Sequence, residues 1–347
     1  MLLSAAMALT GCSSSPTQGA GPPAEATPAR SAAGWFGGYL DVTLPPGPAL
    51  QHDASRGATT VLAFITADPS QPCTPAWGGT LGMEAAGSQL QLDTQIRQAR
   101  AAGGNIAVSF GGHRGQELAT TCREASALAD AYGAVIDRYA LDVVDLDIEG
   151  RAAEPAADQR RAEAMARLQE RRPKDRPLRI WLTLPVRRDG LDEGGRRSIE
   201  AMLAAGVTLE GVNLMTMNFG RLGDGETMLS ASTGAAEATH HYLEQLPFKA
   251  EGSRDAAKLW RSLGLTPMIG DNDVEGNTFS LQDAAGLNAF AADRGLGRLS
   301  FWSINRDTYC PWEAQENVER PSSGCSGVSQ DAGDFAKELG KGFTGGS

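Results

Sequence analysis

The ten residues LDVVDLDIEG, at positions 141–150, read as a buried β-strand that acidic residues interrupt. Aspartate is among the residues most depleted in strands, and burying a carboxylate is costly unless it is paired. The side chains of a strand alternate between its two faces with a period of two. Asp145, Asp147 and Glu149 therefore share one face, whereas Asp142 has the opposite parity. The other face carries the aliphatic side chains Val144, Leu146 and Ile148.

The three acids on one face are close enough to disturb each other's titration. Successive positions on a face are about 6–7 Å apart at Cα, and two charges about 4 Å apart repel by roughly 4 kcal/mol at an effective dielectric near 20. At least one proton is therefore expected to be held above the usual carboxyl pKa, as general-acid catalysis at neutral pH requires.

A metal site and a structural network are the alternatives to catalysis. The stretch contains no histidine, and sites for hard cations usually lie on loops. A structural network of three carboxylates would need counter-charges, and the strand itself carries no Arg or Lys. Perturbed carboxylates are typical of functional sites, so catalysis is favoured over both alternatives.

Short apolar segments alternate with helical patterns on both sides of this stretch. The predicted strands are residues 34–42, 59–67, 105–112, 142–149, 178–186, 211–220, 265–273 and 298–307. The predicted helices are residues 88–102, 122–140, 155–172, 193–206, 230–263, 280–295 and 334–343. Apolar strands that alternate with helices indicate a parallel sheet covered by helices. Eight such units in 347 residues predict an α/β fold of the TIM (β/α)8 barrel type.

The unusual residues of several strands fall at the same end of this predicted barrel. In TIM barrels the active site lies at the C-terminal ends of the strands. Glu149 ends the fourth predicted strand, and residues 109–112 end the third. Residues 215–218 end the sixth, and Trp302 lies on the eighth. These residues are therefore expected to meet at the mouth of the barrel.

The composition is that of a globular protein, with 41% hydrophobic and 21% charged residues. The chain is long enough for one barrel domain with a large core. A formal net charge of −11 and a pI near 4.9 argue against a nucleic-acid partner, which would need basic patches.

The first residues, MLLSAAMALTGCSSS, form an apolar run that is too short to span a bilayer as a helix. The run is typical of an export signal, although no Lys or Arg precedes it. LTGC at residues 9–12 resembles the bacterial lipoprotein box, in which the cysteine is lipidated. Residues 1–12 are therefore predicted to be a lipoprotein signal with Cys12 as the lipidation site. A plain cleaved signal is the alternative.

Residues 13–33 are rich in Pro, Ser, Gly and Ala and show no apolar periodicity, which predicts a disordered linker. The catalytic barrel and a C-terminal tail then occupy residues 34–347. The protein is expected to be exported, either as an extracellular protein or as a cell-envelope lipoprotein. Its only membrane contact would be the N-terminal lipid.

Four cysteines remain after Cys12, and an even number in an exported protein predicts two disulfides. Four cysteines allow three pairings. Cys310 with Cys325 would close a short loop rich in Pro, Ser and Gly, which leaves Cys73 with Cys122. A zinc site is the alternative, but no Cys-x-x-Cys spacing supports it, and no metal is predicted.

The motifs at the predicted barrel mouth resemble those of glycoside hydrolase family 18, the chitinase family. DVVDLDIE resembles the family's D-x-x-D-x-D-x-E signature, and SFGG at residues 109–112 resembles its S-x-G-G motif. Trp302 resembles the tryptophan on the last strand that forms the floor of the substrate site. TADPSQPCTPAWGG and NLMTMNFG look like a bacterial branch of the family. The resemblance covers residues 34–310.

The resemblance implies substrate-assisted hydrolysis, an exception among glycosidases to catalysis by two carboxylates. Glu149 would protonate the glycosidic oxygen, and the substrate's N-acetyl carbonyl would attack the anomeric carbon to give an oxazolinium. Asp147 would orient the acetamido group and stabilise the positive charge, and Asp145 would share a proton with Asp147. Water activated by Glu149 would complete the reaction with retention. Asp142, with its opposite parity, is assigned a structural role.

The sixth strand departs from the family pattern. Many members carry M-x-Y-D there, whereas this chain has Met215, Thr216, Met217 and Asn218. Asparagine can hydrogen-bond a sugar but supplies no charge. Met215, Met217 and Asn218 are nevertheless predicted to contact the substrate.

The remaining predicted contacts to the substrate are aromatic side chains and the third-strand motif. Trp302 is predicted to be a sugar platform, because pyranose CH faces stack on indole rings, and Trp77 to be a second platform on a loop. The family resemblance offers Tyr39 as a subsite residue. Ser109, Gly111 and Gly112 complete the predicted substrate site.

The sequence thus predicts a monomeric, cofactor-independent chitinase that acts on chitin or on N-acetylglucosamine-containing oligosaccharides. An endo-β-N-acetylglucosaminidase acting on glycoprotein or cell-wall glycans is one alternative. A non-catalytic chitin-binding barrel lectin is another, although a lectin would be expected to lack the acid at Glu149.

Overall fold

The computed structural model describes residues 1, 34–44, 50, 58–246, 259–311 and 322–343. The predicted signal, lipidation site and linker, including Cys12, lie in residues 2–33, outside the described residues. The chain divides into two units, and the fold belongs entirely to the second, Ala32–Ser347.

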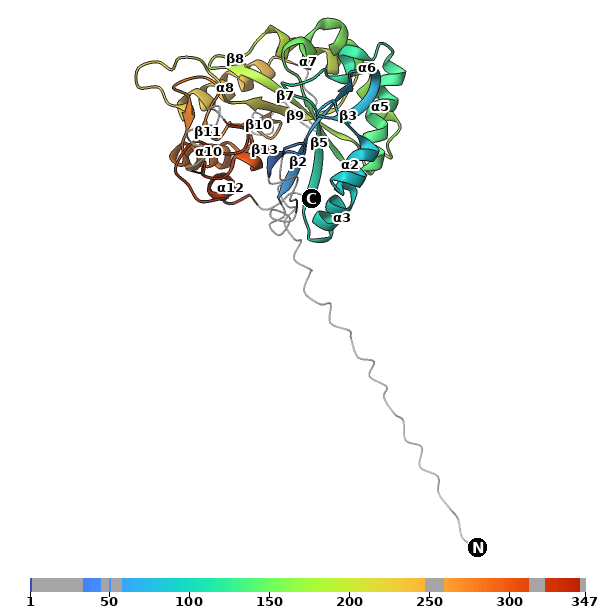
Figure 1. Cartoon of the computed structure of the whole chain (residues 1–347), viewed down its shortest axis with the longest axis horizontal. Coiled ribbons are helices and arrows are strands. Elements are labelled where there is room, and N and C mark those ends of the chain that lie inside the picture. The colour runs from blue at the N-terminus through green and yellow to red at the C-terminus, as the bar shows by residue number, and fades with distance from the viewer. Residues whose placement is uncertain (2–33, 45–49, 51–57, 247–258, 312–321, 344–347) are drawn as a thin grey trace. The chain divides into compact units, whose positions relative to one another are not determined.

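Eight parallel strands close into a barrel, which confirms the predicted TIM (β/α)8 fold (Figure 1). They are β1 (Trp35–Asp41), β2 (Thr59–Asp68), β5 (Asn105–Gly111), β6 (Val143–Asp147), β7 (Arg179–Arg187), β9 (Leu209–Met215), β10 (Leu263–Thr266) and β13 (Arg298–Phe301). β1 pairs in parallel with both β2 and β13, and this double pairing closes the sheet.

Helices surround the barrel on its outer side (Figure 1). They are α2 (Met83–Gln89), α3 (Leu92–Ala101), α4 (Leu118–Thr121), α5 (Ala125–Arg138), α6 (Pro155–Glu170), α7 (Glu193–Ala204), α8 (Met228–Leu243), α10 (Leu281–Arg294) and α12 (Asp334–Leu339). α6 begins at Pro155, whose fixed φ suits the first helical turn. α10 begins after Ser280, whose hydroxyl accepts a hydrogen bond from the Asp283 amide. None of the described helices has the length and apolar character that a bilayer crossing requires.

The apolar core has two parts, as expected for a sheet with one face inside the barrel and one under the helices. The larger part packs the outer face of the strands against the helices. The smaller part fills the barrel interior and consists of Trp35, Tyr39, Val61, Ala63, Ala107 and Trp181.

The structure differs from the sequence prediction mainly between β2 and β5. β3 (Gln71–Trp77) and β4 (Leu81–Gly82) form an antiparallel extension beside β2, where a loop was predicted. The two prolines of β3 argue against a strand in the sequence, and both precede Ala76 and Trp77, the residues that pair with β4. The helix predicted at residues 88–102 is two helices, because Gln91 adopts a left-handed conformation between α2 and α3.

Both predicted disulfides are confirmed. Cys73 of β3 is bonded to Cys122, which ends α4, and Cys310 is bonded to Cys325. The first bond joins segments 49 residues apart and the second closes a loop of 15 residues, so both restrict the unfolded chain.

Candidate active site

The acidic stretch lies on β6 and points into the barrel, as its parity predicts. Asp145 is beside Ser109 of β5, and Asp147 is beside Gly111. Asp145 and Asp147 are buried, with 1% and 4% of their surfaces exposed. Glu149 follows the end of β6 and precedes the short helix η1 (Gly150–Ala153), and its side chain is 24% exposed. The acids therefore form a column that rises from the barrel interior to its mouth.

Asp145, the deepest acid, is fully occupied by donors from four other strands. Its Oδ1 accepts hydrogen bonds from Thr183 at 2.6 Å and Arg298 at 2.5 Å, and its Oδ2 accepts them from Ser109 at 2.7 Å and Tyr39 at 2.9 Å. Four donors, one of them a guanidinium, thus satisfy both oxygens of Asp145.

The expected proton sharing between Asp145 and Asp147 remains a prediction. Donors from other strands fill the acceptor positions of Asp145, and Arg298 is its counter-charge. Above it, the charge of Glu149 contributes to raising the pKa of Asp147.

Arg298 is a buried partner of the acidic column that was not predicted from the sequence. Its guanidinium is completely buried, pairs with Asp145, donates to the Tyr39 hydroxyl at 2.7 Å and lies 4.6 Å from the centre of the Trp35 ring. A signal was present, because residue 298 has the same parity on the last strand as Trp302, which was already placed at the barrel mouth.

Arg298→Met is expected to lower the free energy of unfolding by about 3–5 kcal/mol, because it leaves Asp145 buried without a counter-charge. Urea denaturation measures this loss. The matched control is Arg171→Met, which removes an ion pair to Asp130 whose side chains are 56% and 70% exposed. That pair is expected to contribute at most about 1 kcal/mol. Equal losses in the two variants would contradict the role given to Arg298.

The pKa values of Asp147 and Glu149, the upper two acids of the column, are raised, which is the direction predicted from the sequence. Burial, followed by the charges of Glu149 and Asp145, holds the pKa of Asp147 well above its ordinary value, although Arg298 opposes the shift. Burial also raises the pKa of Glu149, against the opposing charge of His113. The His113 Nδ1 lies 3.8 Å from a Glu149 oxygen, and its side chain is 90% exposed. The Asp147–Glu149 pair can therefore keep a proton where an exposed carboxyl has lost it.

Two glycines allow the end of β5 to approach the acidic strand. A Cβ on Gly111 would lie 2.0 Å from the Asp147 carbonyl oxygen, and one on Gly112 would lie 2.8 Å from the Phe64 ring. Both residues have positive φ, which favours glycine. The Gly112 amide donates to the Asp147 carbonyl at 3.0 Å. These glycines position Asp147, and their contact with substrate remains a prediction.

Trp302 follows β13 and is half-buried beside Phe64. The two rings are stacked, with centres 5.3 Å apart and planes 19° apart, and the Tyr39 ring lies 6.1 Å from Trp302. This arrangement fixes the indole plane while leaving part of it accessible, as a sugar platform requires.

Three predicted substrate contacts are corrected by burial. Trp77 is completely buried, and its Nε1 donates to the Tyr139 hydroxyl of the region after α5 at 3.1 Å, so it is no sugar platform. Tyr39 and Ser109 are 1% and 0% exposed. Their hydroxyls donate to Asp145, so both residues support the acidic column rather than contact a sugar.

An acid from a neighbouring segment, Asp273, lies beside the end of β9, the sixth strand of the barrel. Met215 is buried at the end of β9, Met217 is half-buried, and Asn218 is exposed with a φ of 55°. The Asn218 side-chain amide donates to Asp273 at 3.0 Å, and the charge of Asp273 helps to raise the pKa of Glu149. The negative charge that asparagine lacks is therefore supplied nearby by Asp273, which the sequence reasoning did not find.

Asp142 points away from the acidic column. It accepts hydrogen bonds from Arg172 at 2.9 Å and Arg176 at 2.8 Å, which agrees with its assigned structural role. Burial opposes the effect of these arginines, but their hydrogen bonds and charges leave the pKa of Asp142 lowered. Within the described part of the chain, no group of three or more His, Cys, Asp or Glu residues is arranged to hold a metal ion.

No protein-family model matches the chain. The relatives and solved structures to which it is similar are named as chitinases. The chain is 34% identical over 281 residues to the "Probable bifunctional chitinase/lysozyme" of Escherichia coli (strain K12), and 33% identical over 282 residues to "Endochitinase 11" of Metarhizium anisopliae. Each match covers 78% of this chain. The chain spans only 30% of the first relative's length and 52% of the second's.

Among solved structures, the chain resembles the catalytic domain of a hyperthermophilic chitinase from Pyrococcus furiosus, with 29% identity and a TM-score of 0.74. A structure of active domain 2 of the Pyrococcus furiosus chitinase with chito-oligosaccharides gives 29% identity and a TM-score of 0.75. Both matches cover 89% of this chain and 94% of the other. The chain is therefore similar to chitinases both in sequence and in fold.

Proposed function

We propose that the protein is a chitinase that hydrolyses β-1,4 bonds between N-acetylglucosamine units with retention of configuration. The observation that carries this proposal is the pairing of Glu149, at the barrel mouth, with the buried Asp147 beneath it. Both have raised pKa values, and the charge of Glu149 contributes to the shift of Asp147. A carboxyl group that keeps its proton at neutral pH is the general acid that cleavage of a glycosidic bond needs.

In the first proposed step, Glu149 gives its proton to the glycosidic oxygen as the bond from that oxygen to the anomeric carbon breaks. The acetamido carbonyl oxygen of the same sugar forms a new bond to the anomeric carbon. The product is a cyclic oxazolinium, and the leaving sugar departs with a free hydroxyl. Asp147 accepts a hydrogen bond from the acetamido N–H and stabilises the positive charge.

In the second proposed step, water attacks the anomeric carbon and the bond to the acetamido oxygen breaks. The Glu149 carboxylate takes a proton from the water, which restores the starting state with one water consumed. Two inversions at the anomeric carbon give net retention.

Asp145 and Arg298 form a buried ion pair beneath the two acids that act in this cycle. Asp145 lies behind Asp147 as a bonded carboxylate, so its charge disfavours a second negative charge on Asp147. Arg298 limits this effect, because its charge lowers the pKa of Asp147. The pair at the mouth can therefore exchange one proton without disturbing the network below.

A second candidate function is hydrolysis of cell-wall glycans, which the printed name of the Escherichia coli relative favours. The two functions are separated by incubating the purified protein with chito-oligosaccharides, with peptidoglycan and with a high-mannose glycoprotein, and by identifying the products by mass spectrometry. Cleavage of chito-oligosaccharides into shorter N-acetylglucosamine oligomers supports the proposal. If chito-oligosaccharides are not cleaved and glycans are released from peptidoglycan or from the glycoprotein, the chitinase proposal would be wrong and the second candidate function would take its place.

The pH dependence of kcat/KM is expected to follow the shifted titration of the acidic pair. Because burial raises the pKa of Glu149 above its ordinary 4.5, activity should persist at pH values where an exposed carboxyl is ionised. Activity should then fall as the pH rises through the raised value and the pair loses its proton. Initial rates on a chromogenic chito-oligosaccharide measure the profile. An alkaline limb at the ordinary carboxyl pKa would contradict this assignment.

We also propose that the protein acts outside the cytoplasm as a monomer, on chitin or its oligosaccharides. The two disulfides support an oxidising compartment. The lipid anchor at Cys12 and the cell-envelope location that it implies rest on the N-terminal sequence alone.

A further inference from the structure

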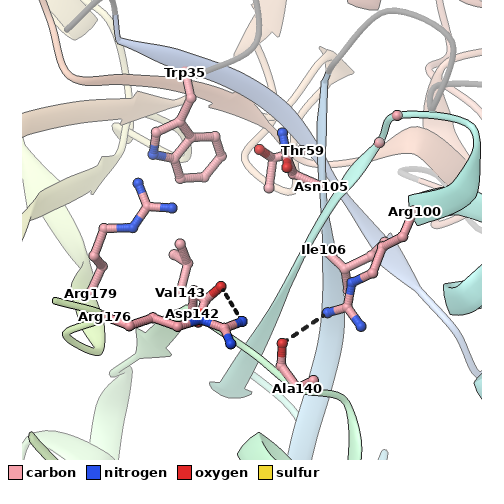
Figure 2. Close-up of a pocket in the computed structure, with 12 residues that line it drawn as sticks. Trp35, Thr59, Arg100, Asn105, Ile106, Ala140, Asp142, Val143, Arg176 and Arg179 are labelled. Carbon is pink, nitrogen blue, oxygen red and sulfur yellow. Dashed lines mark hydrogen bonds and ion pairs between the residues drawn. The ribbon is translucent and has the colours of Figure 1, made fainter. Parts of the chain in front are cut away.

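A cavity of about 560 Å³ opens at the end of the barrel opposite the acidic column (Figure 2). Part of its wall is made by the first residues of five barrel strands, Trp35, Thr59, Asn105, Val143 and Arg179. In a parallel barrel all strands begin at the same end, so this basal cavity is separated from the barrel mouth by the length of the strands. The proposed glycosidase reaction does not use it.

The charged side chains of the basal cavity are mainly arginines, although the whole chain has a net charge of −11. Arg100 comes from the end of α3, Arg176 from the segment before β7, and Arg179 from the first position of β7. Asp142 is the only acid among the described lining residues, and it is already bonded to Arg172 and Arg176. The local field in this cavity therefore favours an anion.

Two of the three guanidiniums have unused donors. The Arg100 side chain donates to the Ala140 carbonyl at 3.3 Å. The charge of Arg179 acts on Asp142, but among the described residues none accepts a hydrogen bond from the Arg179 side chain. In Figure 2 the Arg179 guanidinium points toward Trp35 across open space, while Arg176 is turned to Asp142. Burial also lowers the pKa of Arg100, which shows that this cation is incompletely solvated. A bound anion would satisfy these donors.

We propose that the basal cavity binds a phosphate group through Arg179 and Arg100, either as inorganic phosphate or as part of a small phosphorylated sugar. A guanidinium presents parallel N–H donors that match the oxygens of phosphate, and such charge-assisted bonds are strong. The cavity is larger than phosphate alone, so it has room for the sugar of a small phosphorylated sugar as well.

Isothermal titration of the full chain with sodium phosphate, at constant ionic strength set with sodium chloride, tests the proposal. Wild-type protein is expected to bind one phosphate saturably. Arg179→Gln is expected to weaken binding by about 10-fold or more, because it removes a charge-assisted pair of hydrogen bonds. Arg100→Gln provides a second variant from a different element and is expected to weaken binding as well.

Arg187→Gln is the matched control. Arg187 lies on the same strand, is exposed, and is at the opposite end of the barrel. The Arg187→Gln variant is expected to bind phosphate with the same affinity as the wild type. A parallel titration with glucose 6-phosphate distinguishes inorganic phosphate from a phosphorylated sugar as the ligand. Binding tighter than that of phosphate shows that the sugar is recognised. Equal binding shows that only the phosphate group is recognised. Absence of saturable binding of either compound to the wild type, or equal affinities in Arg179→Gln and Arg187→Gln, would overturn the proposal.

Discussion

Glu149→Gln is expected to lower kcat on chito-oligosaccharides by about 10²–10⁴-fold, the range that general acid–base catalysis contributes. Glutamine has nearly the shape of glutamic acid but no transferable proton. The substitution therefore removes the group that protonates the leaving oxygen and later takes a proton from water. Reducing-end release from a chito-oligosaccharide series measures kcat and KM separately.

Binding of the sugar should survive this substitution, because the half-buried stack of Trp302 on Phe64 is unchanged. Titration of the variant with a chito-oligosaccharide should give an affinity close to the wild-type KM. The matched control is Glu154→Gln, at an acid that is 57% exposed beyond the η1 turn. This control should turn over substrate at the wild-type rate. Substantial activity in Glu149→Gln, with the control also active, would remove Glu149 as the acid.

Asp147→Asn is expected to lower kcat by about 10²–10³-fold, comparable to the loss of one preorganised electrostatic group in other active sites. The amide side chain of this variant has the same length and would still reach the acetamido group, but it would present no negative charge to the oxazolinium. The buried position of Asp147 strengthens the effect, because charges interact more strongly away from water.

A double variant distinguishes a coupled pair from two independent residues. If Asp147 and Glu149 act on one proton and one intermediate, Asp147→Asn together with Glu149→Gln should be hardly slower than Glu149→Gln alone. Asp130→Asn, at an exposed position on α5, controls for the loss of a carboxylate and should leave kcat unchanged. A wild-type rate in Asp147→Asn would show that substrate assistance is the wrong mechanism.

The sequence by itself determined the barrel and the column of acids. Eight apolar segments separated by helical patterns predict parallel strands, because each segment's periodicity depends only on its own residues. The position of Asp145, Asp147 and Glu149 on one face follows from the period of a single strand. The disulfide pairing could be predicted because one short loop left a single remaining pair.

Only the tertiary structure decided what lies across from each acid. Arg298 is 153 residues from Asp145 in the chain, and closure of the barrel brings the two side chains into contact. The same holds for Asp273 beside Asn218 and for Trp77, which the packing of β3 against α5 buries. Strand periodicity shows which way a side chain points, but the register and closure of the sheet determine which neighbour it meets. For this reason the ion pair of Asp145 with Arg298, and the identity of the charged groups that raise or lower the pKa of Asp147, could be read only from the folded barrel.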